Sequence, residues 1–201
     1  FSLSACDKDD ETMMPDLTYD IPTTYTFDNV SYTGQTTRLA MFSELKSYIA
    51  TSREAGTTLD ADRLQAMFEN DQANAQWTQS YDDSKQLKSK TFENEQAAFE
   101  ALLLEMAQAS ASTEVASDGV AGRATSLDGE KTYLLGEDGL DHAQLIEKGL
   151  MGACLYYQST AVYFSADRMD VDNETIEPGE GTAMEHHWDE AFGYLGVPFD
   201  F

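Results

Sequence analysis

The sequence predicts an all-α protein, folded as a helical bundle. Apolar side chains recur every three to four residues along several stretches, which is the period of a helix buried on one face. The chain of 201 residues has only 13 glycines and 4 prolines, few for an all-β protein that needs frequent turns. Hydrophobic residues make up 41% of the composition, which is enough to build a core and excludes global disorder.

The first half of the chain carries three segments with helical periodicity. After the turn at residues 32–37, apolar residues follow the helical spacing to about Ala55, and Gly56 ends the run. A second helix is expected from about Asp60 to Asn70 and a third from about residue 91 to residue 112. Residues 113–140 contain much of the glycine, and we therefore expect a long loop there.

The longest helix is expected to begin at Asp141, which is a suitable N-cap with Gln144 three residues later, and to end near residue 165. His142, at its start, is expected at the surface. A patch of small residues at Gly149, Gly152 and Ala153 would let another helix approach closely. Cys154 follows it, and its small apolar surroundings predict a buried, unreactive thiol.

An acidic loop at residues 167–181 leads into a last helix from about Thr182 to Leu195. The loop begins like a calcium-binding EF-hand at Asp170, but Thr175 stands where that loop requires glycine and Gly181 where it requires glutamate. The pattern therefore predicts a solvated loop.

The formal net charge of −25, from 12 Lys and Arg against 37 Asp and Glu, limits the choice of partners. Nucleic acid is excluded as a partner, because phosphate binding depends on clustered basic side chains. An acidic body is also repelled by an anionic membrane surface. The charge favours an extracytoplasmic setting or a surface that attracts cations.

The beginning of the chain resembles the end of a bacterial lipoprotein signal peptide. Residues 1–6 read Phe-Ser-Leu-Ser-Ala-Cys, and the last four match the lipobox, whose cysteine carries the lipid. The resemblance implies that a lipid on Cys6 anchors the body to the outer membrane, in the periplasm or at the cell surface. Residues 7–28 are expected to form an acidic extended tether. Its residues 7–11 resemble an export tag of surface lipoproteins, although a plain solvated tether explains them equally well. The helical domain would then span residues 29–201.

The last helix carries the candidate chemistry. On a wheel of about 100° per residue, His186, His187, Glu190 and Tyr194 lie together. The opposite face, which we expect to pack in the core, has only apolar residues (Met184, Trp188, Ala191, Phe192 and Leu195). Imidazole and carboxylate groups within one turn can share a divalent or ferric ion, but they make only half a site. The alternative is a solvated polar face, which HxxE spacing alone does not exclude.

Three segments resemble an uncharacterised bacterial lipoprotein family related to the imelysins. They are HWDEAFGYLG at residues 187–196, YTGQTTRL at residues 32–39 and KGLMGACLYYQ at residues 148–158. The imelysin motif GxHxxE falls on Glu185, His187 and Glu190, with Glu185 in place of glycine. The resemblance covers about residues 25–201 and implies two helical bundle halves, metal binding at HxxE and a link to iron uptake. A second half would then follow Phe201.

These observations favour a lipid-anchored extracytoplasmic protein that binds a metal ion, with iron as the expected ion, in uptake or sensing. His187 and Glu190 would be ligands and His186 a third, while Glu185 and Tyr194 would hold the ligands by hydrogen bonds. Proteins of metal uptake or of the cell surface would be its partners. Two alternatives remain open. One is a metal-dependent peptidase of imelysin type, in which Glu190 would be a ligand or base and no further catalytic residue is predicted. The other is a non-catalytic cell-surface interaction module.

Overall fold

The computed structural model describes residues 21–200. Cys6, the predicted signal-peptide remnant and residues 7–20 of the predicted tether lie outside this range. The described chain divides into two units. The smaller contains residues 21–26 and 198–200, in which Thr24 and Asp200 form an antiparallel bridge and the Tyr25 N–H donates to the Phe199 carbonyl at 2.6 Å. Residues 27–197 form the larger unit, to which all the helices and strands of residues 21–200 belong.

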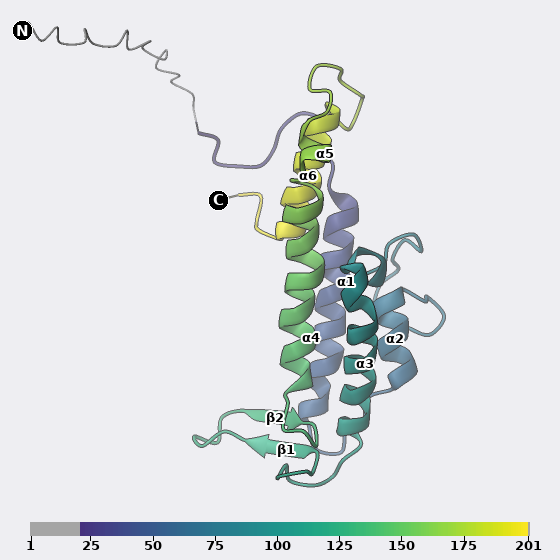
Figure 1. The fold of residues 1–201 in the computed structure, drawn as a ribbon, viewed down its shortest axis with the longest axis vertical. Helices are drawn as coiled ribbons and strands as arrows, with labels where there is room; N and C mark the ends of the chain where they lie inside the picture. The colour runs from purple at the N-terminus through teal and green to yellow at the C-terminus, as the bar shows by residue number, and fades with distance from the viewer. Residues whose placement is uncertain (1–20, 201) are drawn as a thin grey trace, which may run out of the picture. The chain divides into compact units, whose positions relative to one another are not determined.

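Helices dominate the larger unit (Figure 1). The α-helices are α1 (Thr33–Ala50), α2 (Ala61–Glu69), α3 (Glu93–Ser110), α4 (His142–Leu150), α5 (Ala166–Met169) and α6 (Ala183–Leu195). Two short 3-10 helices, η1 (Thr51–Arg53) and η2 (Lys88–Lys90), follow α1 and precede α3. A π-helix, η3 (Met151–Val162), continues α4 directly. None of these helices is both long and apolar enough to span a membrane.

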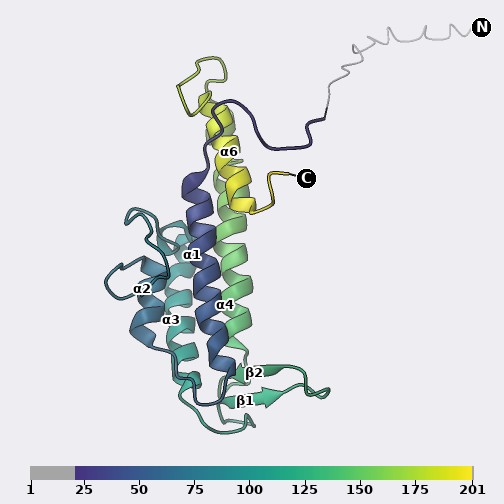
Figure 2. The same cartoon turned by 180° about the vertical axis from the view of Figure 1, so that it is seen from behind.

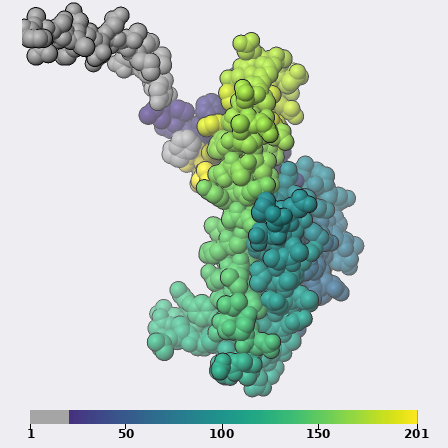
Figure 3. Space-filling model, viewed as in Figure 1, coloured from purple at the N-terminus to yellow at the C-terminus, as the bar shows by residue number. Residues whose placement is uncertain are grey.

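The all-α prediction is wrong, because residues 113–140 include a two-stranded antiparallel sheet. Strand β1 (Gly122–Thr125) pairs with β2 (Thr132–Leu135), with Gly122 opposite Leu135. The sheet stands out from one end of the helices (Figure 3). The fold is therefore mostly helical with a small sheet, rather than a pure bundle.

The hairpin depends on contacts that sequence periodicity does not show. The Arg123 guanidinium donates to the carbonyls of Ser52 and Thr57, at 3.0 and 2.8 Å, and thereby ties β1 to the end of α1. At Gly122, a Cβ atom would clash with the Glu114 carbonyl oxygen, so glycine is required for this approach. Strands of four residues give too short a pattern to separate from a glycine-rich loop.

The core lies between α1, α2, α3 and α4, and α1 runs beside α4 in both views of the fold (Figures 1 and 2). The following side chains are almost completely buried there: Met41, Leu45, Leu64, Met67, Phe68, Leu103, Met106, Ile146, Leu150 and Cys154. Cys154 is a free thiol, and burial raises its pKa to about 11. The prediction that this cysteine is buried is confirmed.

Side chains cap three of the helices, and Asp141 is the cap that the sequence predicted. Asp60 accepts from the backbone N–H groups of Asp62 and Arg63, and Asp141 accepts from that of Gln144. Thr182 and Glu185 form a reciprocal capping box at the start of α6. These side chains satisfy N–H groups that the first helical turn leaves unpaired.

The predicted helix over residues 141–165 is continuous to residue 162, but only its first part is an α-helix. From Met151 onward the winding is that of a π-helix, a rare form that often marks functional positions. The predicted small-residue patch serves packing only in part, because Gly152 is exposed and a Cβ atom there would have no neighbour within 4 Å. At Gly149 a Cβ atom would lie 2.8 Å from the Phe99 ring, so glycine lets α3 approach α4 closely. Further along, the Ser159 hydroxyl of η3 donates to the Ala191 carbonyl of α6 at 2.9 Å.

Candidate metal-binding site on α6

Helix α6 presents a different face to the protein from the one predicted. Tyr194 and Ala191 are completely buried, whereas Trp188 and Leu195, which we expected in the core, are 49% and 58% exposed. The close approach of α1 explains the difference, because a Cβ atom at Gly193 would lie 2.7 Å from the Cβ of Tyr32. The small residues therefore face inward, and the Trp188 ring packs on Phe164 at the surface.

As a consequence, the predicted polar cluster is partly buried rather than solvated. The side chains of His186, His187 and Glu190 are 28%, 14% and 18% exposed. One carboxylate oxygen, Glu190 Oε2, lies 3.4 Å from His187 Nδ1 and 3.8 Å from His186 Nε2. The other, Oε1, accepts a hydrogen bond of 2.9 Å from the Gln35 amide of α1. Both imidazoles thus converge on one oxygen, whose carboxylate is held from a second helix.

The second ring nitrogen of His187, Nε2, faces the positively charged side chain of Arg168. Arg168, on α5, places a guanidinium nitrogen 3.4 Å from His187 Nε2. Because arginine only donates hydrogen bonds, this contact assigns the lone pair to Nε2 and the proton to Nδ1, which then points to Glu190. The neutral ring is therefore held in one tautomer, between a carboxylate and a guanidinium.

Two tyrosines of the surrounding interior are buried beneath Glu190 and stack on each other, with 5.8 Å between the ring centroids of Tyr163 and Tyr194. Burial raises the pKa of Tyr163 to about 12, and the nearby charge of Glu190 and a hydrogen bond to it act in the same direction. Burial also raises the pKa of Tyr194, and its hydroxyl has no hydrogen-bond partner in the described structure. Both phenols therefore stay protonated at neutral pH.

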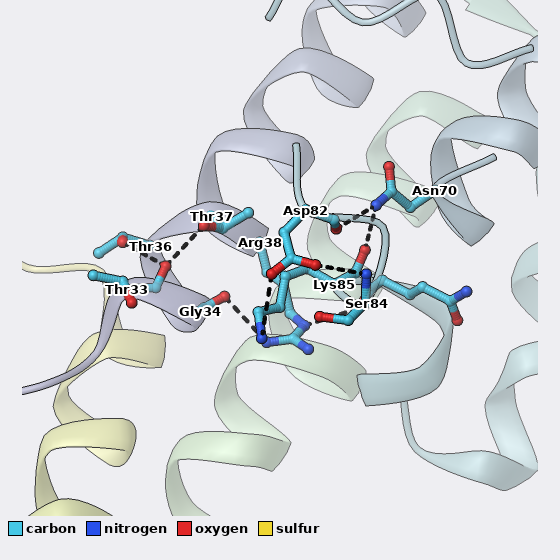
Figure 4. A network of polar contacts seen from close by, with 10 residues as sticks. Thr33, Gly34, Thr36, Thr37, Arg38, Asn70, Asp82, Ser84 and Lys85 are labelled. Atoms are coloured by element: carbon cyan, nitrogen blue, oxygen red, sulfur yellow. Dashed lines mark hydrogen bonds and ion pairs between the residues drawn. The ribbon is translucent and has the colours of Figure 1, made fainter. Parts of the chain in front are cut away.

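Two basic side chains balance the charge of this interior. Burial lowers the pKa of Lys90, and the charge of Arg38 lowers it further while that of Glu190 raises it. Arg38, on α1, is only 6% exposed and donates to the carbonyls of Gly34 and Gln86, at 3.1 and 2.9 Å. Figure 4 shows this guanidinium reaching from α1 to the loop that carries Asp82, Ser84 and Lys85.

The two residues predicted to orient the ligands lie in different places. The Glu185 carboxylate accepts from the Thr182 N–H at 2.9 Å, so it caps the helix. Tyr194 lies in the interior near Tyr163.

His186 and His187, in contrast, line an open pocket of about 270 Å³ together with acidic residues of the preceding loop (Asp172, Glu177 and Glu180). The pocket gives the imidazoles an entrance with negative charge.

A metal ion fits this cluster in part. Two donor atoms that bind one tetrahedral ion at about 2.1 Å each lie about 3.4 Å apart, which is the separation of His187 Nδ1 and Glu190 Oε2. The distance to His186 Nε2 is slightly longer, at 3.8 Å. As the side chains stand, residues 21–200 contain no group of three or more His, Cys, Asp or Glu arranged to hold a metal ion.

Comparison with known families identifies the chain. The family model described as Domain of unknown function (DUF4856) matches residues 22–198. The chain belongs to this family. Comparison with curated proteins and with solved structures gave no match.

Sequence reasoning missed several residues that build this part of the DUF4856 domain. Gln35 and Arg168 contact Glu190 and His187 from other helices, and nothing in their local sequence indicates this. Asp189 is 6% exposed and accepts from the Ser31 N–H at 2.8 Å, which ties the segment before α1 to α6. Its neighbours along the chain, Trp188 and Glu190, do not indicate that this carboxylate is buried.

Proposed function

We propose that this DUF4856 protein binds a divalent or ferric metal ion at the His186, His187 and Glu190 cluster and acts in iron uptake or sensing. The proposal includes a relation to the imelysins, on the strength of the HxxE motif, and an extracytoplasmic location with a lipid on Cys6, on the strength of the lipobox. The observation that carries it is the convergence of two imidazole nitrogens on one carboxylate oxygen of α6.

The surroundings favour a cation at this point. Glu190 is held by Gln35, so the carboxylate is positioned before any ion arrives. The pocket in front of the imidazoles is lined by three further carboxylates, which raise the local concentration of cations. Binding through His187 Nδ1 would require the neutral ring to take its other tautomer, with the proton on Nε2, the nitrogen that faces Arg168.

Arg168 acts against the ion, because its guanidinium lies beside His187. Its position on the exposed α5 lets the side chain turn toward solvent when a cation binds. The opposing charges make a clear expectation: removing Arg168 should strengthen binding, while removing the donor atoms should weaken it.

The test is a titration of the chain with Zn²⁺, monitored by calorimetry and by the imidazole NMR signals of His186 and His187. We expect His187→Ala/Glu190→Gln to bind at least about tenfold more weakly, since two donor atoms are lost. Arg168→Ala should bind more tightly. Glu95→Gln, which removes one exposed carboxylate from α3, serves as the control and should leave the affinity unchanged.

Equal affinity in the wild type and in His187→Ala/Glu190→Gln would overturn the proposal, as would Zn²⁺ binding that leaves both imidazole signals in place. The NMR readout separates this cluster from any other site on the acidic surface. Repeating the titration with Fe²⁺ without oxygen and with chelated Fe³⁺ then tests the preference for iron.

A further inference from the structure

The third histidine, His142, lies in a second polar cluster, far from α6. It is the first residue of α4, where the sequence predicted a surface position, but it is only 4% exposed. The prediction is wrong because the segment between β2 and α4 covers the ring. Neither of its ring nitrogens has a hydrogen-bond partner in the described structure. A buried imidazole without partners is unfavourable for folding, so its burial calls for an explanation.

Two carboxylates face this ring from different elements. His142 Nε2 lies 3.6 Å from Glu105 Oε2 of α3 and 3.6 Å from Asp138 Oδ2 of the segment before α4. Both distances are too long for a hydrogen bond. They are close to the separation of about 3.4 Å between two donor atoms that share one tetrahedral ion. Each of the two carboxylate oxygens thus lies at about the distance from the same imidazole nitrogen that a shared ion would set.

The surrounding backbone is shaped for this arrangement. A Cβ atom at Gly136 would lie 2.6 Å from both Asp138 Oδ1 and His142 Cε1, so glycine makes space for the two side chains. The cluster borders a pocket of about 340 Å³, which Gln108 and Glu137 also line. A hydrogen bond from the Leu140 N–H holds the pKa of Asp138 below its ordinary value. That carboxylate is therefore ionised at neutral pH.

The effects that disfavour a cation at the His142 cluster are weaker than those that favour it. The start of α4 carries the positive end of the helix dipole, which disfavours a cation, but its effect is that of a partial charge. The capping carboxylate of Asp141 offsets it at the first turn. Glu105 and Asp138 bring two full negative charges, and their side chains are 51% and 47% exposed, so they are free to turn inward and close on an ion.

We propose that His142, Glu105 and Asp138 form a second cation site, which takes a divalent ion of the zinc type. One imidazole nitrogen and two carboxylate oxygens are donors that such ions accept, with the pocket supplying water for a fourth position. The three side chains are not closed around a point as they stand, and the ion would draw the two carboxylates together. The site lies at the start of α4, at the end of the helices opposite the start of α6 (Figure 1).

The test uses the chain with His187→Ala/Glu190→Gln already in place, so that the α6 cluster does not contribute. Zn²⁺ affinity is measured by competition with a chromophoric chelator, and Co²⁺ is added to record its visible absorption. Adding Glu105→Gln/Asp138→Asn should weaken Zn²⁺ binding at least about tenfold and remove the intense bands of tetrahedral Co²⁺. The amide that replaces the Asp138 carboxylate keeps an acceptor for the Leu140 N–H, and both positions are half-exposed, so these variants should fold.

Glu93→Gln/Glu95→Gln is the matched control, because it removes the same two charges from exposed positions on α3. It should leave both Zn²⁺ affinity and the Co²⁺ spectrum unchanged. An equal loss of affinity in the control would show general attraction by acidic surface charge and overturn the proposal. No Zn²⁺ binding in the starting chain, or unchanged binding in Glu105→Gln/Asp138→Asn, would also overturn it, whatever the outcome at α6.

Discussion

The two histidine clusters of this protein are built in opposite ways. On α6, both histidines and Glu190 lie within five residues of each other, and the helix alone brings them together. The His142 cluster draws its three members from α3, the segment after β2 and the start of α4. The α6 histidine His187 has a partner on each nitrogen, whereas His142 has none on either in the described structure.

The difference teaches that local spacing and local burial are separate questions. Helical geometry predicts which side chains of α6 meet, and they do meet. It does not predict which face of the helix turns inward, since that depends on α1 and η3. For His142 even the burial was predicted wrongly. The groups around His142 come from distant segments, so its burial cannot be predicted from the residues next to it in the sequence.

The prediction with the largest expected effect concerns how far the α6 cluster depends on packing against α1. In Gly193→Ala the new Cβ atom would lie 2.7 Å from Tyr32 Cβ and 2.8 Å from Gln35 Cβ. Overpacking of this kind costs about 1–3 kcal/mol, and the better helix propensity of alanine returns up to about 1 kcal/mol. We expect the free energy of unfolding, measured in urea, to fall by about 1–2 kcal/mol.

Gly152→Ala is the matched control, because a Cβ atom at that helical position has no neighbour within 4 Å. The same substitution should there leave the free energy of unfolding unchanged or raise it by up to about 1 kcal/mol. If both variants changed stability with the same sign, α6 would not rest on α1 as closely as the structure shows, and the cluster would be a property of one helix.

A second test compares the two histidines directly. In EDTA at about pH 8, His142→Leu should raise the free energy of unfolding by about 1 kcal/mol, since an apolar side chain replaces buried nitrogens that lack partners. His187→Leu should lower it by a similar amount, because Glu190 and Arg168 lose their hydrogen-bonding partner. Urea unfolding of both variants provides the measurement. Destabilisation by His142→Leu would mean that its ring is satisfied within the fold and needs no ion to explain it.

Much of the helical architecture was predictable from the sequence, because capping residues and apolar spacing are local signals. Asp60 and Asp141 both cap the helices that were expected to begin there. The sheet was not predictable, since β1 is held by Arg123 bonds to carbonyls about seventy residues earlier in the chain. Nor was the π-helical winding of η3, because the residues that follow Gly149 show ordinary helical periodicity.

The candidate site on α6 was likewise predictable where its contacts are local in sequence and unpredictable where they are not. The meeting of His187 with Glu190 follows from a three-residue spacing on one helix. The hydrogen bond from Gln35 and the contact with Arg168 join positions 155 and 19 residues apart. These contacts decide whether the cluster is solvated or held in place, and only the packed structure contains them.

The smallest expected effect concerns a carboxylate whose partners, unlike those of His142, are complete. Glu44 on α1 accepts from the Tyr81 hydroxyl at 2.6 Å and from the Thr78 N–H at 2.9 Å. Burial alone would raise the pKa of Glu44, but these hydrogen bonds outweigh it and hold the pKa below the ordinary value of 4.5. The stability that they contribute is present above about pH 4.5 and is lost as the pH falls through the lower pKa of the folded state.

The stability advantage of the wild type over Glu44→Gln should therefore shrink as the pH is lowered from about 6 to about 3. We expect a change below about 1 kcal/mol, since the carboxylate is partly exposed and screened by solvent. The measurement is urea unfolding of both proteins at each pH. In a Tyr81→Phe background, which lacks the shortest hydrogen bond, the same difference should depend less on pH. An identical pH dependence in both backgrounds would mean that the Tyr81 hydroxyl does not stabilise the charged form of Glu44. A complete set of hydrogen-bond partners would then matter less for stability than the contrast between His187 and His142 implies.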